Sequence, residues 1–111
     1  MWWLAVLLTQ VPLPGTSSVS VPLGTPSACG RCHGGFEDAS AFDTWAGSAM
    51  GHSARDPWFW SALEEAEKDV PGVGDFCLRC HAPEAWLAGL CLPSDGSRLT
   101  DDDDGVGCSF C

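Results

Sequence analysis

The sequence predicts a mainly α-helical protein with little strand. Apolar residues recur at the i, i+3, i+4, i+7 spacing of amphipathic helices, whereas the alternating pattern of strands is hard to find. The chain of 111 residues also contains 13 glycines and 8 prolines, which interrupt regular structure and favour turns. We therefore expect short helices joined by long loops.

Residues 1–28 differ from the rest of the chain. An unbroken apolar run at residues 2–8 is followed by a stretch rich in Pro, Gly, Ser and Thr, and the segment carries no charged side chain. The run resembles the apolar core of an export signal, although no Lys or Arg precedes it. We predict that residues 1–28 are a signal peptide or a disordered leader, and that residues 29–111 form the domain.

Three or four short helices are expected in that domain. Residues 37–51 should form the first, because one face then holds the apolar residues Phe42, Trp45, Ala46 and Ala49. Asp56 and Pro57 are typical of an N-cap and a first helical position, and a second helix from there should end at residues 70–72. Residues 76–81 should form a short third helix, and Pro83 should begin a fourth that runs to about residue 90. Residues 93–107 are expected to be a turn-rich loop.

The charge balance excludes some classes of partner. Fifteen Asp and Glu residues stand against five Lys and Arg, for a formal net charge of -10. Such a chain repels a phosphate backbone, so nucleic-acid binding is not expected. No apolar run approaches the roughly 20 residues of a spanning helix, so no transmembrane span is expected either.

Seven cysteines dominate the candidate functional residues. Two C-x-x-C-H motifs are present, and a C-x-x-C pair ends the chain. The motifs are Cys29, Cys32 and His33, then Cys77, Cys80 and His81, and the pair is Cys108 and Cys111. The C-x-x-C-H pattern is typical of c-type haem attachment. Two cysteines one helical turn apart can form thioethers to the haem, and the adjacent His can ligate the iron.

Other interpretations of the cysteines stay open. Cys77, Cys80, Cys108 and Cys111 also fit a structural zinc site with four thiolate ligands, although their separation is longer than in common zinc ribbons. Disulfides within the C-x-x-C pairs are a third interpretation. Cys91, the odd cysteine, is expected to be a small buried apolar residue.

The third C-x-x-C lacks a following His, so we predict that the protein continues past Cys111 with His and a third haem site.

Distal iron ligands are also scarce. Met50 and His52 are the candidates, against the alternatives of a core methionine and a surface histidine. Residues two apart on a helix point in different directions, so both would ligate only on different haems.

These motifs resemble the multihaem c-type cytochromes, close to the cytochrome c554-like group. Residues 45–50, WAGSAM, are similar to the W-x-x-S-x-H pattern of that group, with Met50 at the position of a distal haem ligand. The resemblance implies helices and loops wrapped around covalently bound haem c, two in this chain. It also implies electron transfer in the periplasm or outside a bacterial cell, with redox proteins as partners.

An acidic surface would suit a basic redox partner. A haem enzyme that acts on a small nitrogen or sulfur oxyanion is an alternative function. It would need an open iron site and positive side chains, of which the chain has few.

Overall fold

The computed structural model describes residues 23–36, 40–101 and 105–111. Of these residues 57% are helical and none is in a strand, which confirms the mainly α expectation. The elements are α1 (Pro26–His33), α2 (Ala41–Ala46), α3 (Ala49–His52), α4 (Pro57–Asp69), α5 (Gly74–His81), α6 (Pro83–Leu87) and a final 3-10 turn, η1 (Cys108–Phe110). Of the predicted signal peptide or disordered leader, residues 1–28, the part from residue 1 to residue 22 lies outside the described residues.

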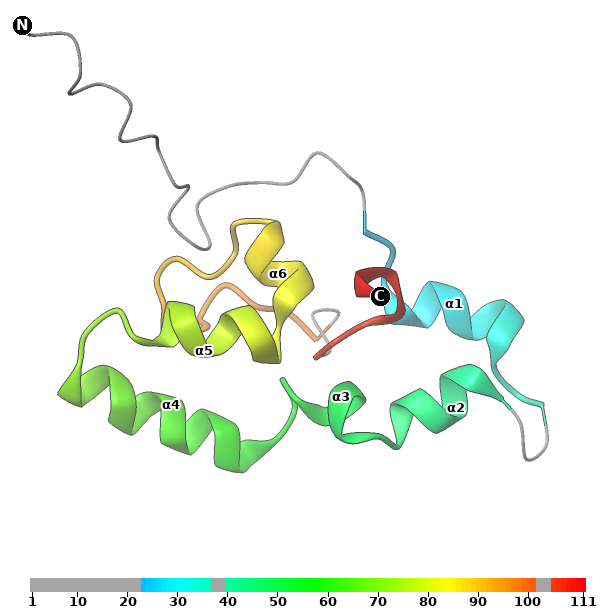
Figure 1. Cartoon of the computed structure of the whole chain (residues 1–111), viewed down its shortest axis with the longest axis horizontal. Coiled ribbons are helices and arrows are strands. Elements are labelled where there is room, and N and C mark those ends of the chain that lie inside the picture. The colour runs from blue at the N-terminus through cyan, green and yellow to red at the C-terminus, as the bar shows by residue number, and fades with distance from the viewer. Residues whose placement is uncertain (1–22, 37–39, 102–104) are drawn as a thin grey trace, which may run out of the picture.

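The helices form two groups (Figure 1). In one group α1 packs against α2, α2 contacts α3, and η1 at the C-terminus lies beside α1. In the other group α5 packs against both α4 and α6. Each group therefore contains one C-x-x-C-H motif, on α1 and α5 respectively.

The prediction that residues 37–51 form one continuous helix was wrong. Of its described part, α2 ends at Ala46 and α3 begins at Ala49, and residues 37–39 lie outside the described residues. Ser48 breaks the helix because its backbone is extended, with φ -86° and ψ 162°, and its hydroxyl accepts a hydrogen bond from the Gly51 N–H. Serine is a preferred N-cap, so it begins a new helix here.

The second predicted helix is confirmed as α4. The Asp56 carboxylate accepts a hydrogen bond of 2.9 Å from the Trp58 N–H, which satisfies a free donor of the first turn. Lys68 pairs with Glu64 one turn earlier at 3.0 Å on the exposed face. The helix ends at Asp69, directly before residues 70–72, which were expected to end it. Gly72 in that stretch adopts φ +94°.

The third and fourth predicted helices differ from α5 and α6 only at their ends. The α5 helix begins at Gly74, two residues before the expected start. The α6 helix ends at Leu87 rather than near residue 90, because Ala88 caps it and Gly89 turns the chain with φ +75°. The described parts of the predicted loop, residues 93–101 and 105–107, are irregular as expected.

The α1 helix begins at Pro26, three residues before the predicted start of the domain. Pro26 is buried and stands at the first helical position, where its missing N–H costs nothing. The described structure therefore extends a short way into the predicted leader. No helix among the described residues is both long and apolar enough to cross a membrane.

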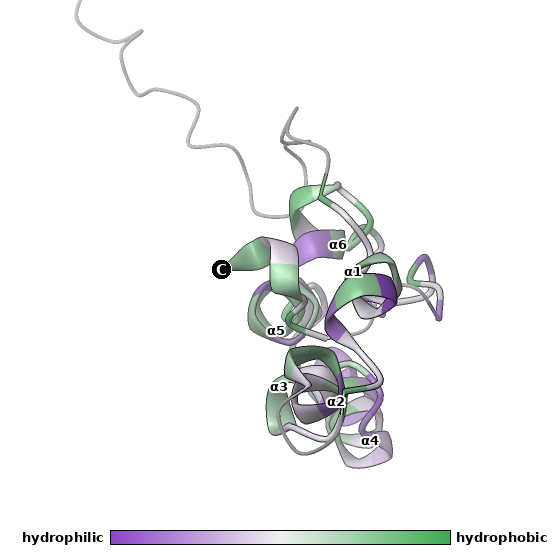
Figure 2. Cartoon of the chain, turned by 90° about the vertical axis from the view of Figure 1, so that its right-hand side faces the viewer, coloured by the Kyte–Doolittle hydropathy of each residue, from purple (hydrophilic) through white to green (hydrophobic). Residues whose placement is uncertain are grey.

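The apolar core is thin for a chain of this length. Its buried members are three alanines, two leucines and one cysteine: Ala54, Leu63, Leu78, Ala82, Ala85 and Cys91. Cys91 is fully buried, as predicted for the odd cysteine. Large apolar side chains remain exposed, among them Trp58 at 82% and Phe76 at 68%. Figure 2 shows hydrophobic residues reaching the outside of the molecule at η1, where Phe110 is exposed.

Candidate haem-attachment sites

The motif on α5 is the most firmly held of the predicted sites. Glu67, near the end of α4, accepts hydrogen bonds from the Gly72 and Gly74 N–H groups, and these bonds fix the first turn of α5 against α4. The Gly72 bond is the largest cause that lowers the pKa of the Glu67 carboxyl. Leu78, inside the motif, is fully buried in the core. The motif thus lies on a helix anchored at its start and at its middle.

His81 is oriented by two neighbours that lie earlier in the chain. Its Nδ1 lies 2.8 Å from the Ser53 carbonyl oxygen. Because a carbonyl only accepts, Nδ1 carries the proton and the lone pair lies on Nε2. The ring also stacks on Phe59 of α4, with centroids 3.9 Å apart and planes inclined by 7°. A fixed tautomer of this kind is typical of histidines that ligate a metal through Nε2.

Ser53 makes a second contact with the same residue. Its hydroxyl lies 2.8 Å from the His81 carbonyl oxygen and 2.9 Å from the Met50 carbonyl oxygen, so these two acceptors share its one proton. These bonds join the end of α3 to the end of α5. The sequence analysis identified neither Ser53 nor Phe59 as a neighbour of His81. A serine in a turn carries no signal for a partner 28 residues away.

The two cysteines of this motif have different surroundings. Cys77 is half-buried and packs against the core, whereas Cys80 is exposed. Cys80 lines an apolar groove of about 440 Å³, which lies in the size range of small-molecule and cofactor sites. The other lining residues are Arg79, Pro83, Trp86, Leu87 and Phe110.

Arg79 supplies the positive charge beside this groove. Its guanidinium lies 5.4 Å from the Phe76 ring centroid and 6.0 Å from that of Trp86, within the range of cation–π attraction. Burial raises the pKa of the neighbouring Asp75 carboxyl, while Trp86 and the Arg79 charge act in the opposite direction. Asp75 Oδ1 and the Trp86 indole nitrogen are buried without a well-formed hydrogen bond among the described residues.

The motif on α1 is more open. Cys29 is half-buried, and Cys32 and His33 are exposed. The Ser40 hydroxyl donates to the His33 carbonyl oxygen at 2.8 Å, so this contact restrains the His33 backbone and not its ring. At Gly30 a Cβ would stand 3.1 Å from the Phe42 ring, which shows how closely α2 approaches α1.

The third C-x-x-C pair lies beside the first motif. Cys108 begins η1, and both Cys108 and Cys111 are exposed. The pKa of the Cys108 thiol is raised, first by partial burial and then by the charge and hydrogen bonding of the Cys29 thiol. The fold therefore brings together cysteines from opposite ends of the described chain.

The candidate distal ligands Met50 and His52 both lie on α3 and are exposed, Met50 by 54%. The Met50 carbonyl oxygen accepts from the Val106 N–H at 3.0 Å, which places α3 against the segment that leads to the third C-x-x-C pair. Trp45 strengthens this contact, because its indole N–H donates to the Val106 carbonyl oxygen at 2.7 Å.

The four cysteines of the zinc interpretation do not converge. Among the described residues, which include all four, no group of three or more His, Cys, Asp or Glu side chains is placed to hold a metal ion. A closed zinc site requires four such ligands around one centre. The structure therefore offers the C-x-x-C-H motifs as separate sites.

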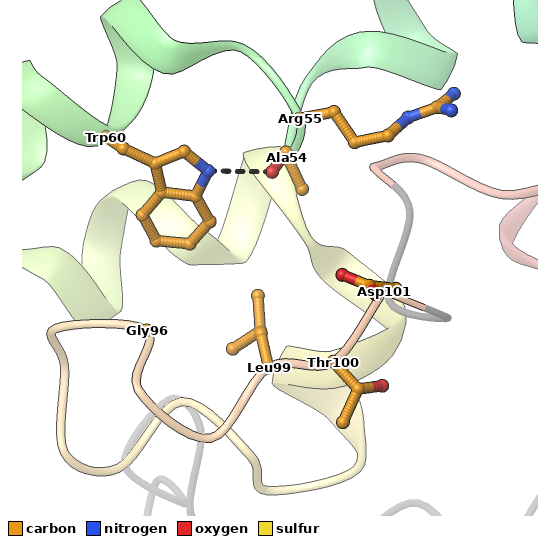
Figure 3. Close-up of a pocket in the computed structure, with 7 residues that line it drawn as sticks. All are labelled: Ala54, Arg55, Trp60, Gly96, Leu99, Thr100 and Asp101. Carbon is orange, nitrogen blue, oxygen red and sulfur yellow. Dashed lines mark hydrogen bonds between the residues drawn. The ribbon is translucent and has the colours of Figure 1, made fainter.

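A further pocket of about 570 Å³ lies away from the predicted sites (Figure 3). Trp60 forms one wall and donates its indole N–H to the Ala54 carbonyl oxygen at 2.9 Å. The Trp60 ring occupies the space that a side chain at Gly96 would need, and Gly96 adopts φ +75°. Arg55 at the rim donates to the Gly51 carbonyl oxygen. No residue predicted to bind haem lines this pocket.

No family model, curated protein or solved structure matches the chain.

Proposed function

We propose that this chain carries covalently bound c-type haems and passes electrons between them and a partner protein. The observation that carries the proposal is the presentation of His81. It follows Cys77 and Cys80 at the attachment spacing, and its ring is held with Nε2 as the free electron-pair donor.

The surroundings of the α5 motif also suit a large apolar cofactor. The groove beside Cys80 is almost entirely apolar in lining, and Phe76 leaves 68% of its surface exposed next to Cys77. Burying such surface against a porphyrin would contribute roughly 25 cal/mol per Å². Arg79 at the groove supplies a cation for a carboxylate substituent.

Each residue of the two motifs has a role in the proposed function. Cys77 and Cys80 would attach the second haem, and His81 would ligate its iron. Cys29, Cys32 and His33 would do the same for the first haem. Bound haem supplies an iron that gains and loses one electron, and the protein sets its potential through ligands, burial and hydrogen bonds. Met50 and His52 remain the proposed distal ligands.

The proposed location is the periplasm or the cell exterior, which the resemblance to multihaem c-type cytochromes implies. The proposed partner is a basic redox protein. A net charge of -10 would speed its approach at low ionic strength. Association that is insensitive to salt would count against such a partner.

The test is expression with cytochrome c maturation machinery, followed by a pyridine haemochrome spectrum and an intact mass. We expect a c-type α-band and the added mass of two haems. The double variant Cys77→Ser/Cys80→Ser should lose one haem, and Cys29→Ser/Cys32→Ser should lose the other. Cys91→Ala is the matched control, because Cys91 stands outside the three C-x-x-C pairs and its buried thiol should not attach haem. A colourless protein with stoichiometric zinc would overturn the proposal.

A further inference from the structure

The fold joins the start of α1 to η1, although 85 residues separate the contacting groups. The Gly24 N–H donates to the Ser109 hydroxyl oxygen at 3.1 Å, and the Ser109 hydroxyl donates to the Gly24 carbonyl oxygen at 3.0 Å. A reciprocal pair of this kind fixes both distance and register between the two segments. Contacts between α1 and η1 continue the interface.

Cys29 of α1 and Cys108 of η1 lie on the two sides of this interface. Cys108 directly precedes Ser109, and the Cys29 thiol is near enough to raise the pKa of the Cys108 thiol. Cys29 is half-buried and Cys108 is exposed, so a small reagent in solvent has access to the pair. Cys91, in contrast, is fully buried in the core.

We propose that Cys29 and Cys108 form a disulfide in the haem-free chain. The two thiols lose two protons and two electrons and form one S–S bond. An organic or protein disulfide is the oxidant: its S–S bond breaks, and it takes up the electrons and protons as two thiols. The contacts of Gly24 with Ser109 hold the two cysteines together, so this pairing is favoured over pairing within either C-x-x-C.

The disulfide would have a consequence for haem loading, and this step rests on the proposed function. Cys29 belongs to the first C-x-x-C-H motif, so a thioether at Cys29 would require the disulfide to be reduced first. Cys77 and Cys80 are not part of the pair, so the second motif would load in either redox state. The pair therefore acts as a redox control on the first site and, through Cys108, on the predicted third site, but not on the second.

The test uses the full haem-free chain and does not depend on haem. The protein is incubated with oxidised glutathione at mildly alkaline pH, quenched with N-ethylmaleimide in acid and digested with trypsin. Cleavage after Arg31 separates Cys29 from Cys32, whereas Cys108 and Cys111 stay on the peptide 99–111. Mass spectrometry should find peptide 1–31 linked to peptide 99–111.

Two serine variants then show whether Cys108 or Cys111 pairs with Cys29. In Cys111→Ser the linked peptide should form as in the parent, whereas in Cys108→Ser its yield should fall by roughly an order of magnitude, because Cys111 is not held against Cys29. A closed disulfide within peptide 99–111, peptide 1–31 linked to the Cys32 peptide, or no linkage would overturn the inference. None of these outcomes bears on the haem count, so the proposed function fails or stands separately.

Discussion

The two C-x-x-C-H motifs have the same ligand types but are presented differently. On α5 the His81 ring is bonded to the Ser53 carbonyl and stacked on Phe59. On α1 the His33 ring is exposed, and the Ser40 hydroxyl donates a hydrogen bond to the backbone carbonyl oxygen of His33. The motif determines which atoms could bind the proposed haem, whereas neighbouring elements decide whether those atoms are already oriented.

The difference begins with one position inside each motif. The second residue of the motif is Leu78 on α5 and Gly30 on α1. Leu78 is fully buried and ties its helix to the core, whereas Gly30 leaves room for the Phe42 ring. We therefore expect the α5 site to be the more rigid, and the α1 site to be the one that depends on its cofactor for order.

The largest expected effect comes from Leu78→Ala. It removes a fully buried side chain from the thin core, so the free energy of unfolding should fall by about 2–5 kcal/mol. Gly30→Ala is the matched change on α1. There the gain in helix propensity, about 1 kcal/mol, opposes a Cβ contact at 3.1 Å with Phe42. Urea unfolding gives the loss in free energy of unfolding for each variant. Equal losses would contradict the expectation that the α5 site is the more rigid.

The next effect tests the stacked ring. Phe59→Leu keeps an apolar side chain but removes the stack on His81, and should cost about 0.5–1.5 kcal/mol. If the stack also orients the haem ligand, the midpoint potential of the second haem should shift. The measurement uses protein that carries Cys29→Ser/Cys32→Ser and therefore only that haem. Phe42→Leu is the control, because Phe42 packs against α1, and should leave this potential unchanged.

A smaller effect tests how α2 is tied to the segment before η1. Trp45→Phe removes the indole N–H that donates to the Val106 carbonyl oxygen, and should lower the free energy of unfolding by about 1 kcal/mol. Trp58→Phe should have no effect, because Trp58 is 82% exposed. Equal melting temperatures for the two variants would show that the Val106 bond does not stabilise the fold.

Local signals in the sequence predicted much of the fold. Asp56 and Pro57 begin α4 because their capping chemistry acts within one turn. The prediction of one helix over residues 37–51 was wrong because it relied on the apolar spacing and gave no weight to Ser48. Serine side chains compete for backbone hydrogen bonds and can interrupt a helix. Spacing alone does not show that a serine will cap a new helix rather than continue the old one.

The contacts around the candidate sites were not predictable in the same way. Ser53 reaches His81 over 28 residues, and Gly24 reaches Ser109 over 85. Such pairs depend on how helices pack, and one sequence carries no pairing signal for them. The motifs identified the candidate haem residues, but the difference in their presentation appeared only in three dimensions.

The smallest expected effect separates the two motifs by pH. Near the α1 motif, the neighbouring Ser40 side chain and the Gly35 N–H, which donates to Asp43 Oδ2, lower the pKa of the Asp43 carboxyl. It therefore stabilises the folded chain above the ordinary aspartate pKa of about 3.9, and this contribution is lost as the pH falls further. Near the α5 motif, burial raises the pKa of Asp75, so its charge destabilises the fold at neutral pH and protonation relieves this.

The two asparagine variants should therefore change pH dependence in opposite directions. Asp43→Asn should remove part of the loss of stability in acid, whereas Asp75→Asn should raise stability at neutral pH and leave it nearly unchanged near pH 3. Melting temperatures from roughly pH 3 to pH 7 measure both slopes against the parent. Parallel curves for the two variants would mean that these carboxyls do not distinguish the surroundings of the motifs. Opposite slopes would show that burial of Asp75 near the α5 motif and hydrogen bonding of Asp43 near the α1 motif affect stability in opposite ways.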